Sequence, residues 1–198
     1  MMRTEDKKGV AVYCASSSLI DPLYVNAARE LGEAIAREGY DVVCGGGRAG
    51  LMAAVIEGAL DAGGEAIGVL PAFMIERGWH HPRASRVIET DSMHSRKQTM
   101  ASLSRAAIAL PGGCGTFEEL LEIITWRQLG LFSGHVIIYN VNGYYDPLIA
   151  MLNRSVEQHF MNPDHARLWN VVTSAEQALA IVRQHVVERE FTQKITRD

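Results

Sequence analysis

The stretch Leu110-Pro111-Gly112-Gly113-Cys114-Gly115-Thr116-Phe117-Glu118-Glu119 follows an apolar run, residues 106–110, that is typical of a buried strand. Apolar residues then recur at the spacing of a helix, at Phe117, Leu120, Leu121 and Ile124. A strand that enters a glycine turn and then a helix presents unpaired backbone N–H groups, and the helix dipole adds partial positive charge. Because glycines let the backbone approach an anion closely, the stretch predicts an anion site made of Gly112, Gly113, Gly115 and Thr116.

Two kinds of side chain extend this site beyond a simple phosphate loop. Thr116 is expected to cap the helix or to donate its hydroxyl to the same anion. Glu118 and Glu119 are expected in the first helical turn, within reach of whatever is attached to a bound phosphate. The alternative is a glycine-rich turn whose acids only suit the helix dipole. We favour phosphate binding because the hydroxyl and the carboxylates come together.

The bulk composition indicates a globular protein without a strongly charged surface. The chain has 198 residues, 47% apolar and 21% charged, and its net charge of −4 lacks the basic excess expected of a nucleic-acid or membrane surface. No apolar run approaches the ~20 residues that span a bilayer. The polar N-terminus lacks the apolar core of a signal peptide, and the three cysteines form no CxxC pair. We expect a single domain over residues 1–198, with a core from about 9 to 188, in the cytoplasm.

Strand and helix patterns alternate along the chain, which predicts an α/β fold, a Rossmann-like, three-layer, doubly wound domain with a mostly parallel sheet. Strands are expected at 9–14, 40–44, 65–70, 87–88, 106–110 and 135–140. Helices are expected at 22–38, 50–62, 117–129, 146–160 and 174–188, and a further helix is expected to begin at 91 or 92 and to end at about 104. The segment 71–86 is expected to be irregular. Ligands of such sheets bind at the carboxyl ends of the strands. The loops 15–18, 45–47 and 111–116, and the segment before Arg96, should therefore meet at one edge.

The segment Gly45-Gly46-Gly47-Arg48-Ala49-Gly50 satisfies the G-x-G-x-x-G pattern of dinucleotide-binding loops, which is weak by itself. A ribose-binding acid should end the next strand, but that strand ends in Gly68-Val69-Leu70-Pro71. We therefore do not expect a hydride-transferring NAD enzyme. A tight turn that packs a helix on the sheet and a loop that contacts a nucleotide remain equal alternatives.

Arg96 and Lys97 open a helix at another strand end and would place two cations beside the anion site. Lys97 is the only lysine in the body of the chain, and cations in a first helical turn oppose the dipole. These features favour a functional role over the alternative of solvated surface charge.

Glu119, Ile123 and Trp126 fall opposite the apolar stripe of the helix that follows the glycine turn. Apolar residues on that side predict a covered surface, either a subunit contact with Glu119 at its rim or a contact with another helix of the same chain. His80, His81 and His94 lack the spacing of a metal site. Cys114 has no base partner that the sequence identifies.

Four segments together resemble the signatures of the LONELY GUY (LOG) family, whose members are often mislabelled as lysine decarboxylases. They are the PGGxGTxxE segment 111–119, the MHxRK segment 93–97, the GGGxxGLM segment 45–52 and the GYYDPL segment 143–148. The resemblance extends over nearly the whole chain. It implies a Rossmann-like fold, a homodimer or hexamer, and hydrolysis of the N-glycosidic bond of cytokinin riboside 5′-monophosphates and AMP, with no metal or organic cofactor. The lysine decarboxylase label would imply a pyridoxal phosphate Schiff base, and we reject it because Lys97, the only lysine in the body of the chain, is expected beside the anion site.

The resemblance also implies the roles of individual residues. Glu119 matches the final acid of the signature and would stabilise the charged sugar and activate water, while Arg96 matches the catalytic arginine. The substrate-binding residues would be Met93, Lys97, Gly112, Gly113, Gly115, Thr116, Gly46, Ser16 and Glu122. Two alternatives remain, which are a nucleotide-binding sensor without turnover and a general nucleotide nucleosidase of salvage.

Overall fold

The computed structural model describes residues 7–185. In this part of the chain, seven parallel strands form one sheet in the order β4-β3-β2-β1-β5-β6-β7. The strands are β1 (Gly9–Tyr13), β2 (Asp41–Cys44), β3 (Ala66–Pro71), β4 (Arg86–Thr90), β5 (Ser104–Ala109), β6 (His135–Tyr139) and β7 (Asn170–Val172). The chain progresses outward in one direction from β1 to β4 and in the other from β5 to β7. The carboxyl ends of β1 and β5 therefore form the switch point at which such folds bind ligands.

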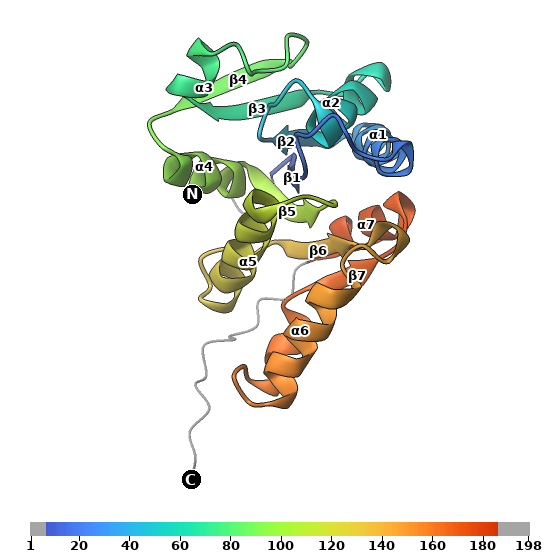
Figure 1. Ribbon diagram of the computed structural model, residues 1–198, viewed down its shortest axis with the longest axis vertical. Helices are drawn as coiled ribbons and strands as arrows, with labels where there is room; N and C mark the ends of the chain where they lie inside the picture. The colour runs from blue at the N-terminus through green and yellow to red at the C-terminus, as the bar shows by residue number, and fades with distance from the viewer. Residues whose placement is uncertain (1–6, 186–198) are drawn as a thin grey trace.

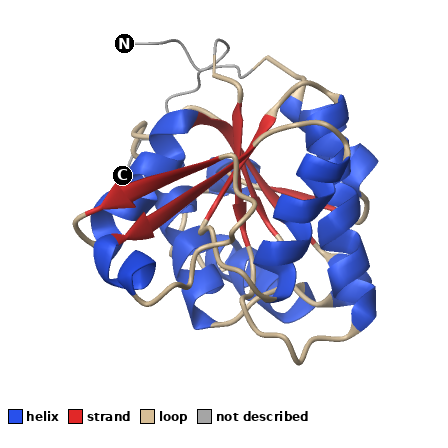
Figure 2. Ribbon diagram, turned by 90° about the horizontal axis from the view of Figure 1, so that it is seen from above, coloured by secondary structure: helices blue, strands red, loops and turns tan. Residues whose placement is uncertain are grey.

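Helices cover both faces of the sheet, as the expected three layers require (Figures 1 and 2). They are α1 (Pro22–Arg37), α2 (Gly50–Asp61), α3 (Ala72–Glu76), α4 (Met93–Leu103), α5 (Cys114–Gln128), α6 (Asp146–Glu157) and α7 (Ala175–Val182), with 3-10 turns at Val141–Gly143 and Pro163–Arg167. Buried residues of α1, α2 and α7 join one core cluster, and those of α4, α5 and α6 join the other. The predicted Rossmann-like α/β architecture is confirmed. Within residues 7–185, no helix combines the length and apolarity needed to cross a membrane.

Three expectations about the elements need correction. The segment 71–86 is not wholly irregular, because it contains the five-residue helix α3. The strand β7 was not expected, since three residues are too few to show a period. The helix expected at 174–188 ends at Val182, and its expected last residues lie outside the described part of the chain.

Backbone contacts bring the loops at the switch point together. Leu110 N–H donates to Tyr13 O (2.9 Å), and Ala15 N–H donates to Pro111 O (3.2 Å). The loop after β1 also meets the start of α2, where a Cβ on Gly50 would lie 2.3 Å from Ser17 O. The glycine turn before α5 and the loops after β1 and β2 therefore share one edge, as the sequence predicts.

Candidate active site

The turn before α5 leaves the start of this helix open. Gly113 is the N-cap residue, and no side chain caps the helix. Gly113, Cys114 and Gly115 are exposed, and a Cβ on either glycine would meet nothing within 4 Å. Because the first N–H groups of a helix have no acceptor within it, the surface above residues 113–115 offers donors to an anion.

Thr116 does not cap the helix, so that expectation is wrong. It is the third residue of α5 and buried, and a Cβ on Gly112 would lie 2.1 Å from its Oγ1. The close contact between Gly112 and Thr116 explains why only glycine fits at position 112. Thr116 therefore packs beneath the turn.

Glu119 lies in the second turn of α5, not the first, and points into the protein. Since α5 begins at Cys114, Glu119 is one turn deeper than expected, and it is 6% exposed. Burial raises the pKa of its carboxyl to about 7, although the charge of Arg96 acts in the opposite direction. A buried carboxyl that titrates near neutrality is suited to accept or donate a proton at physiological pH.

Arg96 reaches Glu119 from the neighbouring helix α4. A capping box between Ser92 and Ser95 starts α4, and Arg96 follows with only 5% exposure. Its Nε donates to Val69 O at 3.0 Å, and its Nη1 lies 3.4 Å from Glu119 Oε1. The guanidinium is therefore fixed between the end of β3 and the buried carboxyl.

Gly45 makes room for this guanidinium. A Cβ at position 45 would lie 2.0 Å from Arg96 Nη2. The next glycine, Gly46, has a φ of +68°, and its carbonyl accepts the N–H of His81 at 2.8 Å. The glycine loop after β2 is thus a tight turn that also packs against Arg96. Sequence reasoning missed this role of Gly45, because no local pattern pairs residues 51 positions apart.

Lys97 contacts a different pair of acids. Its Nζ contacts Glu118 Oε1 and lies 2.9 Å from Glu122 Oε2, and its side chain is 10% exposed. Burial lowers the pKa of Lys97, but the hydrogen bonds to both carboxylates outweigh this effect and raise it. Lys97 is therefore a buried ammonium between α4 and α5, and the alternative of solvated surface charge is wrong.

The lysines do not fit a pyridoxal phosphate site. A Schiff base requires a neutral amine, whereas two carboxylates hold the ammonium of Lys97. The other lysines among residues 7–185, Lys7 and Lys8, precede β1 at the opposite edge of the sheet.

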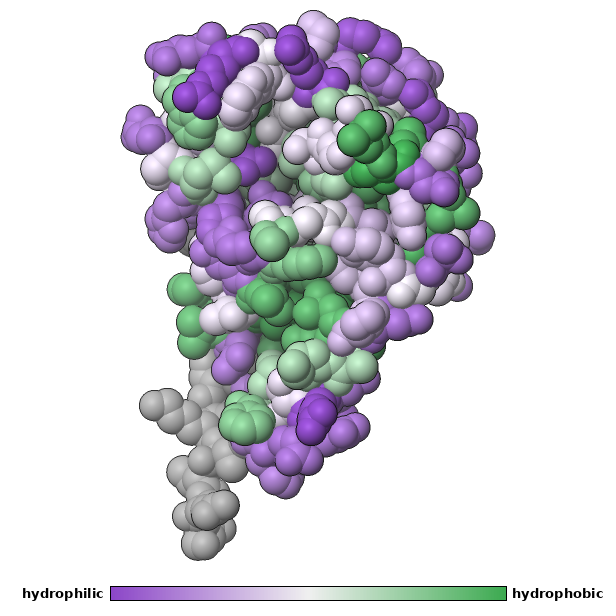
Figure 3. All heavy atoms as spheres, in the orientation of Figure 1, coloured by the Kyte–Doolittle hydropathy of each residue, from purple (hydrophilic) through white to green (hydrophobic). Residues whose placement is uncertain are grey.

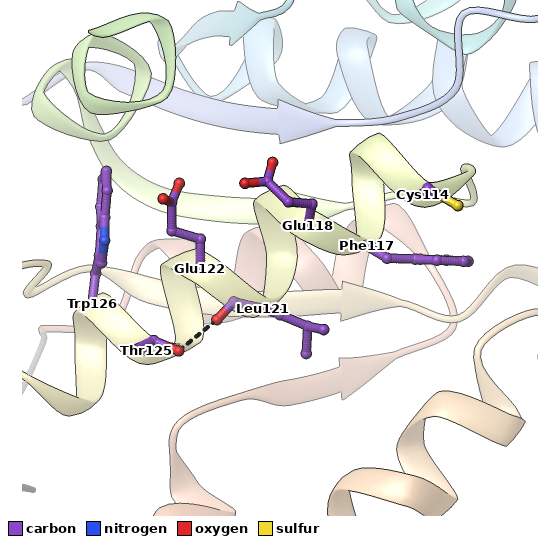
Figure 4. A pocket seen from close by; sticks show the side chains of 7 residues that line it. All are labelled: Cys114, Phe117, Glu118, Leu121, Glu122, Thr125 and Trp126. Atoms are coloured by element: carbon purple, nitrogen blue, oxygen red, sulfur yellow. Dashed lines mark hydrogen bonds between the residues drawn. The ribbon is translucent and has the colours of Figure 1, made fainter. Parts of the chain in front are cut away.

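The outward face of α5 borders a hollow of about 690 Å³. Its lining residues are Cys114, Phe117, Glu118, Leu121, Glu122, Thr125 and Trp126 (Figure 4). The predicted orientation of α5 is wrong in part. Ile123, which was predicted opposite the apolar stripe, is 2% exposed in the core, whereas Leu121, which was predicted in the stripe, is 41% exposed. Thr116 and Glu119 lie on the buried face, and their polarity shifted the apparent apolar stripe.

The remaining candidate residues lie around these groups. Met93 begins α4, is 41% exposed, and has its Sδ 3.9 Å from Arg96 Nη1. Ser16 is exposed in the loop after β1, next to Gly50. Gly46 is buried, and its backbone groups have partners within the chain. The structure thus brings Met93 to Arg96, and Glu122 to Lys97.

Tyr13, at the end of β1, was not expected in the site. It is 3% exposed, and burial together with the charge of Glu119 raises the pKa of its phenol. Within residues 7–185, no group of three or more His, Cys, Asp or Glu residues could hold a metal ion.

Comparison with known proteins shows the family. Residues 52–182 match the family model described as "Possible lysine decarboxylase". A cytokinin riboside 5′-monophosphate phosphoribohydrolase of Arabidopsis thaliana is 40% identical, over 92% of this chain and 85% of the relative. A protein of the same name from Oryza sativa subsp. japonica is 38% identical, over 91% of this chain and 75% of the relative.

Solved structures support the fold. The molybdenum cofactor binding protein of Rippkaea orientalis aligns with a TM-score of 0.69 and 23% identity, over 92% of this chain and 98% of that one. The molybdenum cofactor carrier protein of Chlamydomonas reinhardtii aligns with a TM-score of 0.68 and 22% identity, over 89% and 96%. At this identity the likeness concerns the fold alone. The chain therefore belongs to the LOG family, to which the "Possible lysine decarboxylase" model corresponds.

Proposed function

We propose that this protein is a hydrolase that cleaves the N-glycosidic bond of nucleoside 5′-monophosphates, giving a free base and ribose 5-phosphate. The observation that carries the proposal is the buried Arg96–Glu119 pair, in which burial raises the pKa of Glu119 to about 7. Glu119 lies on α5, the helix whose N-terminus is open and lined by glycines. The names of the curated relatives support this activity.

The 5′-phosphate would bind at the start of α5. Backbone N–H groups of residues 113–116 and the helix dipole would stabilise its charge. Gly115 and Glu119 are four residues apart, or about 6 Å along a helix axis. A ribose held by its phosphate at the helix start would therefore extend toward Glu119.

Glu119 would act on the sugar carbon C1′. As the bond from C1′ to the base breaks, its electron pair leaves with the base and positive charge develops on the sugar ring. A carboxylate next to this charge stabilises it and accepts a proton from the attacking water. The water oxygen then forms the new bond to C1′, and the departing base takes up one proton, which balances the proton that Glu119 removes from the water.

Arg96 would orient the substrate or assist the departing base. Its contacts with Val69 O and Glu119 hold the guanidinium in one place before substrate binds, so little reorganisation is required. Lys97 and Glu122 would assist substrate binding indirectly, by holding α5 in place against α4, because carboxylates of α5 already hold Lys97 Nζ. Met93, Gly46 and Ser16 would border the sugar and the base.

The substrate would be a cytokinin riboside 5′-monophosphate, with AMP as a further substrate. The test is to incubate the protein with AMP, GMP, CMP and isopentenyladenosine monophosphate, and to measure the released base by chromatography. We expect release from the adenine nucleotides. Equal release from all four would identify a general salvage nucleosidase, and tight binding without release would identify a sensor and contradict the proposal.

We also propose a homodimer that forms through the outward face of α5. Figure 3 shows hydrophobic side chains over α5 and α6 on one face of the molecule, and exposed Leu121 and Met151 belong to these helices. Light scattering of the wild type and of Leu121→Glu tests this, with a dimer expected only for the wild type. A wild-type monomer contradicts it, and a hexamer would show a further interface. A cytoplasmic location is proposed because Cys14, Cys44 and Cys114 are free thiols.

A further inference from the structure

Two adjacent tyrosines bind the backbone of the glycine turn before α5. Tyr144 OH donates to Gly112 O at 2.7 Å, and Tyr145 OH donates to Leu110 O at 2.7 Å. Both tyrosines follow β6, more than 30 residues later in the chain. The proposed reaction gives neither of them a role.

These bonds complete a set of three on consecutive carbonyls. Pro111 O, between the two, accepts Ala15 N–H at 3.2 Å. The carbonyls of Leu110, Pro111 and Gly112 are therefore each held by a donor from another loop.

Fixing a carbonyl also fixes an N–H group. A trans peptide is planar, and its C=O and N–H point in opposite directions. When Tyr144 holds Gly112 O, the N–H of Gly113 must therefore point away from Tyr144. In the same way, Ala15 sets the direction of the Gly112 N–H. Glycines have many accessible backbone conformations, so without these bonds the N–H groups would be oriented less uniformly.

The tyrosines are themselves held firmly. Tyr145 is 1% exposed, and its own N–H donates to Asn140 Oδ1 at 2.7 Å. The rings of Tyr144 and Tyr145 pack edge to face, with centroids 5.2 Å apart, and both lie within 6.5 Å of the Phe117 ring in the first turns of α5. The cluster thus connects the loop after β6 to both the glycine turn and the helix.

We infer that the hydroxyl of Tyr144 is a positioning group for phosphate binding, which orients the N–H of Gly113 toward a phosphate monoester before it arrives. Tyr145 holds Leu110 O, whose peptide contains the nitrogen of Pro111 and therefore no N–H, so its hydroxyl fixes only where the turn begins. The inference rests on the proposed function only in its choice of ligand. It predicts that the Tyr144 hydroxyl matters for the phosphate and not for the base or for the chemical step.

The test compares Tyr144→Phe and Tyr145→Phe with the wild type, since each variant keeps the ring and removes one hydroxyl. Tyr40→Phe is the matched control, because Tyr40 lies just before β2 at the opposite edge of the sheet and stacks on Arg105 (5.1 Å). The affinity for ribose 5-phosphate is measured by calorimetry. The ratio of kcat/KM for AMP to that for adenosine is measured separately, together with the melting temperature.

We expect Tyr144→Phe to bind ribose 5-phosphate about 5-fold more weakly, the loss typical of one hydrogen bond, and to lower the AMP-to-adenosine ratio while kcat changes little. Tyr145→Phe should lose less affinity, because the peptide that Tyr145 holds has no N–H. The control should match the wild type. Unchanged affinity in Tyr144→Phe, or an equal loss on AMP and adenosine in that variant, would overturn the inference and assign its hydroxyl to the fold alone. Tyr144, which is 38% exposed, keeps the test decisive if Tyr145→Phe fails to fold.

The two proposals fail in different ways. A wild type that binds ribose 5-phosphate but releases no base contradicts the proposed function, whereas weaker binding by Tyr144→Phe would still support the tyrosine inference. A wild type that releases base, with unchanged affinity in Tyr144→Phe, contradicts the inference alone.

Discussion

The two adjacent cations of α4 meet α5 in different ways. Arg96 faces the buried carboxyl of Glu119, and both side chains are 6% exposed. Lys97 contacts Glu118 and Glu122, of which Glu118 is 55% exposed. In the buried contact, one cation meets one acid whose pKa is raised to about 7. In the outer contact, two acids hold one cation and raise its pKa. The difference indicates that chemistry belongs to the Arg96–Glu119 pair and that the Lys97 cluster joins the helices.

The largest effect is expected at Glu119. Glu119→Gln keeps the shape of the side chain but cannot accept a proton, so we expect kcat for base release to fall by about 10³-fold, within the range for general acid–base groups. Glu118→Gln, in the outer cluster, is the matched control and should retain most activity. Similar rates for the two variants would remove the distinction between the clusters.

Arg96→Ala is expected to lower kcat/KM by about 10²-fold, the order measured for loss of one preorganised electrostatic contact. Circular dichroism should show that the fold survives. Near-normal base release by this variant would exclude Arg96 from the reaction.

The pH dependence of the wild type tests the state of Glu119. Because burial raises its pKa to about 7, the carboxylate that accepts a proton predominates only above that pH. The value of kcat/KM should therefore rise with pH and level off above about 7, with roughly a tenfold loss per unit below it. Arg96 lowers this pKa, so Arg96→Ala should move the midpoint to higher pH. A wild-type profile that is flat from pH 5 to 8 is the contrary result.

Gly45→Ala tests the packing that holds Arg96. The added Cβ would lie 2.0 Å from Arg96 Nη2, so the guanidinium must move, and we expect about a tenfold loss of kcat/KM, since small misplacements of catalytic groups are costly. Gly47→Ala is the control, because its Cβ would meet only the flexible Met52 side chain at 3.1 Å. Equal losses in both variants would show that the effect belongs to the loop as a whole.

Lys97→Met should have the smallest effect on turnover, about twofold, with a loss of about 1 kcal/mol in the free energy of unfolding, because its acidic partners are partly exposed and become hydrated. Steady-state kinetics and urea denaturation measure the two quantities. A large rise in KM for the nucleotide would instead show that Lys97 contacts the substrate.

The sequence predicts the layers, the parallel sheet and the shared edge of the loops, because strand and helix periods are strong in this chain. It also marks Arg96 and Glu119 through their motifs. The sequence does not predict which side of α5 is buried, because Thr116 and Glu119 lie in the buried stripe and interrupt its apolar pattern.

Contacts between residues that are distant in the sequence could not be predicted from local patterns either. The room that Gly45 leaves for Arg96, and the bonds of Tyr144 and Tyr145 to the glycine turn, depend on the order of strands in the sheet. The spacing of residues along the chain does not indicate these contacts. Such residues are found from packing geometry.

The most direct test is a crystal structure of the Glu119→Gln variant with AMP. We expect the phosphate to lie against the N–H groups of residues 113–116 and the C1′ atom to lie next to the side chain at position 119. A phosphate bound elsewhere, or a C1′ atom far from that side chain, would contradict the proposed function.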